Sequence, residues 1–123
     1  LLMAHRINYK SKLKNKFNAK RTEFSGRKYD SKMEAGYAET LEWRKKAGEL
    51  TEIIPQFKID IRINGKHWRN YYIDFKCLRK DGIWEYHEVK GFATEVWKMK
   101  WGALVMLKEE LLEPGAELIV IKK

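Results

Sequence analysis

The feature that most constrains the fold is an alternating stretch of apolar and charged residues that ends in a turn signal. From residue 57 to 63 every second residue is apolar, which is the two-residue period of a half-buried β-strand. Asn64-Gly65 follows directly, and this pair strongly favours a hairpin turn. The sequence therefore predicts an antiparallel pair, with the second strand at about residues 68–78.

Helical signals flank this hairpin on both sides. Ser31 is a suitable N-cap for a helix from residue 32 to about residue 47. Thr94 can cap a second helix at about residues 95–112. The chain of 123 residues is long enough for one hydrophobic core, so we expect a single folded domain.

Two more strands complete the predicted sheet. Lys80-Asp81-Gly82 is a turn signal, and a third strand is expected at about residues 83–90. After the second helix, the apolar run at 118–121 predicts a strand that is buried on both faces. Because a helix connects these last two strands, we expect them to be parallel. The predicted fold class is therefore α/β, with a mixed sheet flanked by helices.

Positive charge is concentrated at the N-terminal end of the chain. Residues 1–28 hold nine Lys or Arg residues and one acidic residue, whereas the whole chain has a formal net charge of +9. Residues 1–28 are expected to be a flexible arm that binds a polyanion, most simply DNA, and residues 29–123 to be the folded domain. A solubilising tail is the alternative interpretation. The candidate DNA-binding residues of the arm are Lys14, Lys16, Lys20, Arg21, Arg27 and Lys28.

The cysteine content and the hydropathy of the chain indicate in which cellular compartment it is expected. Cys77 is the single cysteine, so no internal disulfide is possible. No apolar run approaches the ~20 residues that a membrane-spanning helix needs. We expect a cytoplasmic protein that does not associate with a membrane.

Charged residues also stand inside the predicted apolar strands. Asp74 lies in the second strand, and Glu88 and Lys90 lie in the third, where their spacing of two places both on one face. Burying such groups is costly unless they have partners, so their position between apolar neighbours indicates a site. The alternative is an exposed sheet face with a Glu88–Lys90 ion pair.

The turn between the second and third strands decides whether Asp74 joins Glu88. A two-residue loop, Asp81-Gly82, would place the two carboxylates on opposite faces. A three-residue loop, Lys80-Asp81-Gly82, pairs Asp74 with Glu88, and a glycine in third place favours it. Two carboxylates that face each other repel, and a hard divalent cation, Mg²⁺ or Mn²⁺, would remove that cost.

The turn of the first hairpin leaves a similar question open. A two-residue loop would put Ile59 and Ile61 on the face of Asp74. A three-residue loop lets the two isoleucines share one core with Ile73 and Phe75. We favour the longer loop, because it groups the apolar side chains on one face.

These residues resemble the signature of the PD-(D/E)XK nuclease superfamily. Asp74, followed after a hairpin by Glu88-Val89-Lys90, is similar to its D…ExK pattern, and Glu34 is similar to the helical acid of its resolvase branch. Lys32-Met-Glu34-Ala35 also fits the helix start of a phage-associated group. The resemblance covers most of the chain and is closest to small phage and archaeal Holliday junction resolvases. Ile73 departs from the pattern, since a proline precedes the aspartate in the family's name.

The resemblance implies a restriction-endonuclease-like core and a metal-dependent site. Asp74 and Glu88, together with the Val89 carbonyl, would hold Mg²⁺, for which Mn²⁺ could substitute. Lys90 would orient the attacking water or offset charge that develops on the phosphate. Glu34 would complete the metal shell, and its alternative role is to close a capping box at the start of its helix.

Four residues near the motif have two interpretations each. Thr94 could help the helix N-terminus bind a DNA phosphate or could simply cap the helix. Lys98 and Lys100 could contact DNA or be solvated. Gln56, just before the first predicted strand, could reach the site or be a polar residue at the strand edge.

Aromatic residues near the motif are expected to be structural. Trp97 and Trp101 lie one helical turn apart, so we expect both in the core rather than in contact with bases. His87 is adjacent to Glu88 but points to the opposite face of its strand, so we do not expect it to be a ligand.

The expected function is that of a Mg²⁺-dependent DNA endonuclease, most simply a Holliday junction resolvase. Symmetric cleavage of a four-way junction needs two active sites, which predicts a homodimer. The alternatives are another nicking or restriction-like nuclease of the same superfamily, a non-catalytic DNA-binding module and an RNA-binding structural protein. Asp74 and Glu88 favour the nucleases over the two non-catalytic alternatives, because clustered carboxylates do not help a protein to bind phosphates. A phage origin would place the protein in the bacterial host cell.

Overall fold

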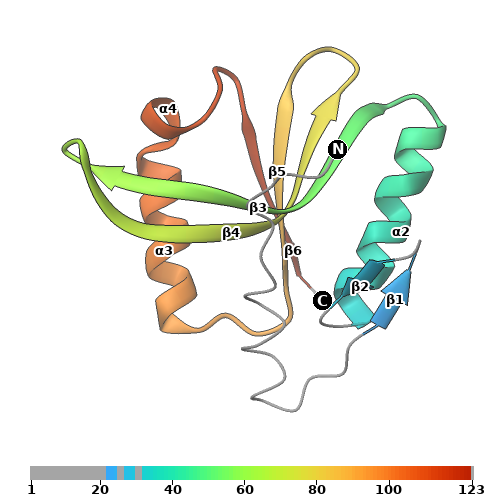
Figure 1. Cartoon of the computed structure of the whole chain (residues 1–123), viewed down its shortest axis with the longest axis horizontal. Coiled ribbons are helices and arrows are strands. Elements are labelled where there is room, and N and C mark those ends of the chain that lie inside the picture. The colour runs from blue at the N-terminus through green and yellow to red at the C-terminus, as the bar shows by residue number, and fades with distance from the viewer. Residues whose placement is uncertain (1–21, 25–26, 30–31, 123) are drawn as a thin grey trace.

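The computed structural model describes residues 22–24, 27–29 and 32–122 (Figure 1). Its helices are α2 (Lys32–Lys46), α3 (Glu95–Met106) and α4 (Lys108–Leu111). Its strands are β1 (Thr22–Phe24), β2 (Arg27–Tyr29), β3 (Leu50–Ile63), β4 (Lys66–Arg79), β5 (Trp84–Lys90) and β6 (Glu117–Lys122). The predicted succession of helix, three strands, helix and strand is present, which confirms the α/β class.

Strands β3, β4, β5 and β6 form one mixed sheet in that order. The β3–β4 and β4–β5 pairs are antiparallel and the β5–β6 pair is parallel, as the intervening helical segment predicted. In Figure 1 the β3–β4 hairpin extends across α3, and α2 lies on the other side of the molecule. The two helices have separate core clusters: Leu41 of α2 packs with Phe75, and Leu104 of α3 packs with Ile73.

The C-terminal strand is more exposed than predicted. β6 lies at the edge of the sheet, and its residues 118–121 are only partly buried. The prediction of burial on both faces was wrong, because an apolar run does not distinguish an edge strand from a central one. Leu118 packs against the α3 cluster and Ile121 against the α2 cluster, so each face of β6 is covered in part.

The boundaries of two elements also differ from prediction. β3 begins at Leu50 rather than at residue 57, because its first half lacks the alternation that marks its second half. The helix predicted at 95–112 is divided at Leu107, whose φ of −103° and ψ of 15° are not helical. Within the described residues, no helix has the length and apolar character that crossing a membrane requires.

Strands β1 and β2 form an antiparallel pair beside α2, and the sequence did not predict them (Figure 1). They lie at the end of the segment assigned to the basic arm. Residues 1–21 and 25–26 of that segment lie outside the described residues. Its role as a separate DNA-binding arm therefore stays a prediction.

The turn between β4 and β5 has the predicted three-residue form. The Arg79 amide donates to the Ile83 carbonyl at 2.9 Å, which closes the loop around Lys80-Asp81-Gly82. Gly82 has a φ of 88°, in the left-handed region that favours glycine. The resulting register pairs Phe75 with His87, as expected.

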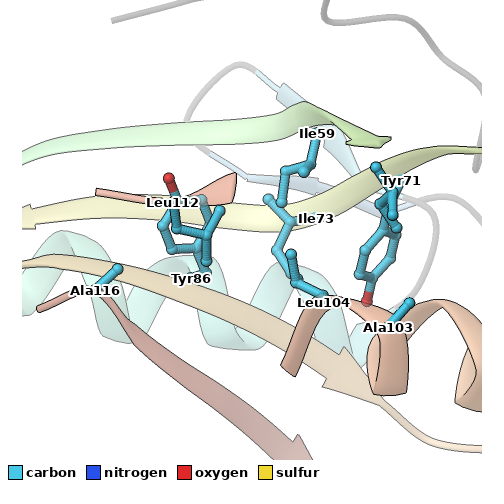
Figure 2. Packing of buried hydrophobic residues seen from close by; sticks show 9 residues of the cluster. Ile59, Tyr71, Ile73, Tyr86, Ala103, Leu104, Leu112 and Ala116 are labelled. Carbon is cyan, nitrogen blue, oxygen red and sulfur yellow. The ribbon is translucent and has the colours of Figure 1, made fainter. Parts of the chain in front are cut away.

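In the first hairpin the isoleucines pack as expected, but the turn differs from the predicted one. Asn64-Gly65 is a two-residue loop with φ values of 53° and 76°, so the preference for a longer loop was wrong. A β-bulge next to Ile61 then shifts the register by one residue. As a result Ile59 lies opposite Tyr71 and packs in one core cluster with Ile73 (Figure 2). Ile61 belongs to the same cluster.

Phe75 does not belong to that cluster, which corrects the expectation of one shared core. Although Ile73 and Phe75 are two residues apart in β4, they pack with different helices. Residues two apart in a regular strand share a face, so the strand changes orientation at the residue between them, Asp74. Gln56, which lies opposite Asp74 in the register, has a φ of 54° and breaks the alternation of β3 at the same level.

Candidate functional site

Three buried carboxylates come from three elements around this irregular part of the sheet. Glu34 lies in the first turn of α2, Asp74 in β4 and Glu88 in β5. Their exposed fractions are 1%, 0% and 1%, respectively. Carboxylates are rarely buried so completely without partners, so the contacts of each one define the site.

Asp74 lies where the pairing of β4 with β5 ends. The last backbone pair is Phe75 with His87, and beyond it the Asp74 carboxylate accepts a 2.8 Å hydrogen bond from the Val89 amide. A side chain thus takes the place of a backbone acceptor in the ladder. The predicted register therefore brings Asp74 next to the Glu88-Val89 segment, at the point where the two strands separate.

Glu88 and Lys90 are ion-paired on one face of β5, as their spacing predicted. The Lys90 Nζ lies 3.2 Å from the Glu88 Oε2, and 19% of the Lys90 side chain is exposed. The same ammonium group lies over the ring of Trp97, 4.9 Å from its centroid. Lys90 is therefore held on two sides and keeps access to solvent.

Tyr71 and Trp97 connect α3 to Glu88. The Trp97 Nε1 donates a 2.8 Å hydrogen bond to the Tyr71 hydroxyl oxygen. Burial raises the pKa of Tyr71, and the negative charge of the nearby Glu88 carboxylate raises it further. Tyr71 is therefore protonated at neutral pH, and its hydroxyl lies near the Glu88 carboxylate. The sequence pattern predicted Trp97 in the core but not its bond to Tyr71, because Tyr71 faces α3 only as a result of the change of strand orientation at Asp74.

Gln56 links Glu34 to the sheet. Its Nε2 donates a 3.0 Å hydrogen bond to the Glu34 Oε2, and its own carboxamide oxygen is buried without a hydrogen-bond partner among the described residues. Of the two interpretations of Gln56, the structure supports the one that places it at the site. Ser31 lies outside the described residues, so the capping box is not tested.

The start of α2 also lies against the end of β5. A side chain built at Gly91 would lie 3.8 Å from the Met33 sulfur, which places the residue before Glu34 next to the residue after Lys90. Gln56 therefore links Glu34 to β3, between the pairs that flank Asp74, and the Val89 amide links Asp74 to the segment that carries Glu88 and Lys90. Within residues 22–24, 27–29 and 32–122, however, no three His, Cys, Asp or Glu side chains are arranged to hold a metal ion.

The residues that were predicted to bind DNA lie in different surroundings. Thr94 caps α3, since its hydroxyl accepts from the Trp97 amide at 3.1 Å, and Lys98 is ion-paired with Glu95 at 3.1 Å. Lys100 donates to the Asn70 carbonyl at 3.4 Å. Arg27 and Lys28 belong to β2, whose side chains the structure does not describe. The arm residues Lys14, Lys16, Lys20 and Arg21 lie outside the described residues.

A second buried polar cluster lies on the α2 side of β5. The His87 Nδ1 accepts a 2.5 Å hydrogen bond from the Tyr37 hydroxyl, and its Nε2 donates to Glu85 at 2.8 Å. Arg44 holds the same Glu85 carboxylate at 3.0 and 3.4 Å. Burial alone would raise the pKa of Glu85, but the bonds from Arg44 and His87 outweigh it and lower the pKa. His87 thus points away from Glu88, as expected.

The chain belongs to the family described as "Protein of unknown function (DUF1064)", which it matches over residues 14–110. The match covers most of the chain and includes all the carboxylates and the lysine of the candidate site. No curated protein and no solved structure matches the chain.

Proposed function

We propose that this protein is a metal-dependent DNA endonuclease with a restriction-endonuclease-like core. The observation that carries the proposal is the burial of Asp74 and Glu88 beside Lys90 where β4 and β5 separate, with a third buried carboxylate, Glu34, held by Gln56 at the start of α2. Burying three carboxylates is costly, and a purely structural role does not account for it. The resemblance to the PD-(D/E)XK signature gives the same residues a common purpose.

The donor chemistry of the site fits Mg²⁺. Asp74, Glu88 and Glu34 offer carboxylate oxygens, and Val89 offers a backbone carbonyl, which are the hard ligands that this ion prefers. One oxygen of each carboxylate already accepts from a neighbour: from the Val89 amide, Lys90 and Gln56, respectively. When bound, the ion would polarise the scissile phosphate and lower the pKa of the attacking water.

The protein's own residues have separate roles in this proposal. Lys90, held by Glu88 and the Trp97 ring, orients the attacking water or offsets charge on the phosphate. The Val89 amide fixes the rotamer of Asp74, and Gln56 fixes that of Glu34. Such preorganisation lowers the cost of assembling the site when the substrate arrives.

The proposed substrate is branched DNA, most simply a four-way junction, cut by a homodimer with two sites. The basic segment at residues 1–28 would bind the DNA backbone without reading sequence. Another nicking or restriction-like nuclease of the same superfamily would use the same residues on a different DNA structure.

The test is cleavage of a labelled four-way junction beside a linear duplex of matching sequence, in Mg²⁺, in Mn²⁺ and in EDTA. Paired cuts in the junction alone, and only with metal, are the expected result. Cleavage of both DNAs would replace the resolvase by a less selective nuclease. Tight binding without cleavage in either metal would contradict the enzyme and support the DNA-binding module.

A further inference from the structure

Two cationic side chains lie close together along the contact between β4 and α3. The Lys100 Nζ donates to the carbonyl of Asn70, and Arg69 is the preceding residue of β4. Burial lowers the pKa of Lys100, and the neighbouring positive charge of Arg69 lowers it further. The bond from Lys100 to the Asn70 carbonyl therefore brings its charge next to the residue that follows Arg69, and two neighbouring like charges favour the binding of an anion.

No carboxylate neutralises this pair within the part of the chain that the structure describes. The contrast with nearby cations is clear, because Lys98 is paired with Glu95 at 3.1 Å and Arg62 with Asp60 at 3.2 Å. Arg69 and Lys100 instead contact backbone carbonyls. Their charges are left for a ligand from outside the domain.

Arg69 is held in a fixed orientation at the surface. Its Nη1 donates a 2.8 Å hydrogen bond to the Trp68 carbonyl, and its Cζ lies 5.3 Å from the centroid of the Trp68 ring. Arginine has five N–H donors, so most of them remain available. A planar, oriented guanidinium is well suited to bind a phosphate through two hydrogen bonds.

The pair lies on a direct path from the candidate site. Successive contacts along the contact between β4 and α3 are Trp97 with Tyr71, beside Glu88, and then Lys100 with Asn70. Arg69 precedes Asp74 by five residues in β4, which is roughly 17 Å along a strand. A DNA duplex rises about 3.4 Å per base pair, so this separation corresponds to about five base pairs.

We infer that Arg69 and Lys100 form a binding site for a DNA backbone phosphate, about five base pairs from the phosphate that is cleaved. The inference rests on the proposed function, because it takes the carboxylate site as the point of cleavage. It adds a contact on the folded domain that is separate from the basic N-terminal segment. It also sets a minimum length of DNA on one side of the cut.

The test is the salt dependence of binding to a labelled duplex of about 20 base pairs, about four times the inferred separation. Binding is measured in EDTA, where cleavage is suppressed. Arg69→Ala and Lys100→Ala should each reduce the slope of log Kd against log salt by about 1, and the double variant by about 2. The matched control is Lys45→Ala combined with Lys46→Ala, which removes two charges from the far end of α2. This control should leave the slope unchanged.

Cleavage by the same variants separates the two proposals. With Mg²⁺, Arg69→Ala and Lys100→Ala should raise the KM for DNA more than they lower kcat, since each loses a backbone contact away from the carboxylates, and the Lys45→Ala/Lys46→Ala control should cut at the wild-type rate. Unchanged salt slopes in both variants, with wild-type protein that binds and cuts DNA, would overturn the phosphate site alone. Wild-type protein that neither binds nor cuts DNA would overturn the proposed function, and the phosphate site with it.

Discussion

The indole N–H of Trp97 donates a 2.8 Å hydrogen bond to the Tyr71 hydroxyl, and the nearby Glu88 carboxylate raises the pKa of Tyr71. The ring of the same tryptophan lies under the ammonium group of Lys90, which is ion-paired with Glu88. Trp97 therefore contacts two side chains that lie near one carboxylate, Tyr71 and Lys90. Helix α3 controls the position of the site through this side chain, although it contributes no carboxylate to it.

Replacing the supporting residues should impair cleavage more than stability. Tyr71→Phe removes the hydroxyl that accepts from Trp97 and lies near Glu88, and Trp97→Phe keeps an aromatic ring under Lys90 but removes the N–H donor. Losing one buried hydrogen bond costs about 1–3 kcal/mol. We expect about a tenfold fall in kcat if the loss is felt mainly in the transition state. The measurements are kcat and KM, Mn²⁺ affinity by calorimetry and Tm.

Trp101→Phe is the matched control for these variants. Trp101 stacks on Trp97 with 5.7 Å between ring centroids, but its side chain forms none of the hydrogen bonds that lead to Glu88. It should lower Tm and leave Mn²⁺ affinity unchanged. If Tyr71→Phe and Trp101→Phe had the same effect on metal affinity, Tyr71 would have no positioning role.

Neutral substitutions of Asp74, Glu88 and Lys90 should abolish cleavage and preserve the fold. In Asp74→Asn the carboxamide oxygen can still accept from the Val89 amide, so the unfolding free energy should change by less than about 1 kcal/mol. Glu88→Gln and Lys90→Ala should likewise cut the four-way junction at least about a thousandfold more slowly. Cleavage rates and circular dichroism test this. Asp60→Asn, at an exposed site in β3, is the control, and wild-type rates in all three site variants would refute the assignment.

Much of the fold follows from local signals. The alternation at 57–63, the turn glycines and the helix caps predicted the order of the elements, and the three-residue loop at Lys80-Asp81-Gly82 correctly aligned β4 with β5. These signals succeed because they act over a few neighbouring residues. The parallel pairing of β6 also followed from the sequence, since a helical connection requires it.

The parts that the sequence did not predict depend on long-range packing. The bulge beside Ile61 cannot be read from the Asn64-Gly65 turn, yet it determines that Ile59 lies opposite Tyr71. The change of face at Asp74 likewise has no local signal, yet it places Tyr71 in the α3 cluster. The left-handed conformation of Gln56 has no local cause such as glycine, so its bond to Glu34 was only one of two interpretations. In each case, the surrounding structure selects a backbone conformation that local preference does not favour.

Gln56→Gly should separate backbone strain from side-chain function. A left-handed conformation costs a non-glycine residue roughly 1–2 kcal/mol, which glycine avoids. Losing the bond to Glu34 costs about as much, so the net change in unfolding free energy should be small. Cleavage should fall, because Glu34 loses the donor that orients it. The measurements are urea unfolding and single-turnover rate.

Asn64→Gly provides the comparison for this variant. Asn64 has a φ of 53°, close to that of Gln56, but lies in the exposed hairpin turn. Glycine there should leave stability nearly unchanged or slightly higher and should not affect cleavage. If both glycine variants cut DNA at the wild-type rate, Gln56 would be only a structural residue.

As the pH is lowered, the free energy of unfolding should decrease in two steps because of the cluster around His87. Burial lowers the pKa of His87 from 6.5, although Glu85 partly opposes the shift, so the unfolded chain takes up a proton below pH 6.5 that the folded protein does not. Unfolding free energy is therefore lost as pH falls below 6.5, by at most about 1.4 kcal/mol per pH unit. The pKa of Glu85 is lowered from 4.5, so its contribution is present above pH 4.5 and is lost below it.

His87→Gln should remove the first step and keep the second. Burial raises the pKa of Tyr37 to about 12, so its hydroxyl stays a donor throughout this range and can bond to the glutamine carboxamide oxygen. The carboxamide nitrogen can donate to Glu85 in place of the His87 Nε2. Urea unfolding from pH 4 to 8 measures both steps, with the exposed His67→Gln as control. A decline between pH 6.5 and 5 that persists in His87→Gln would assign the loss of stability to another group.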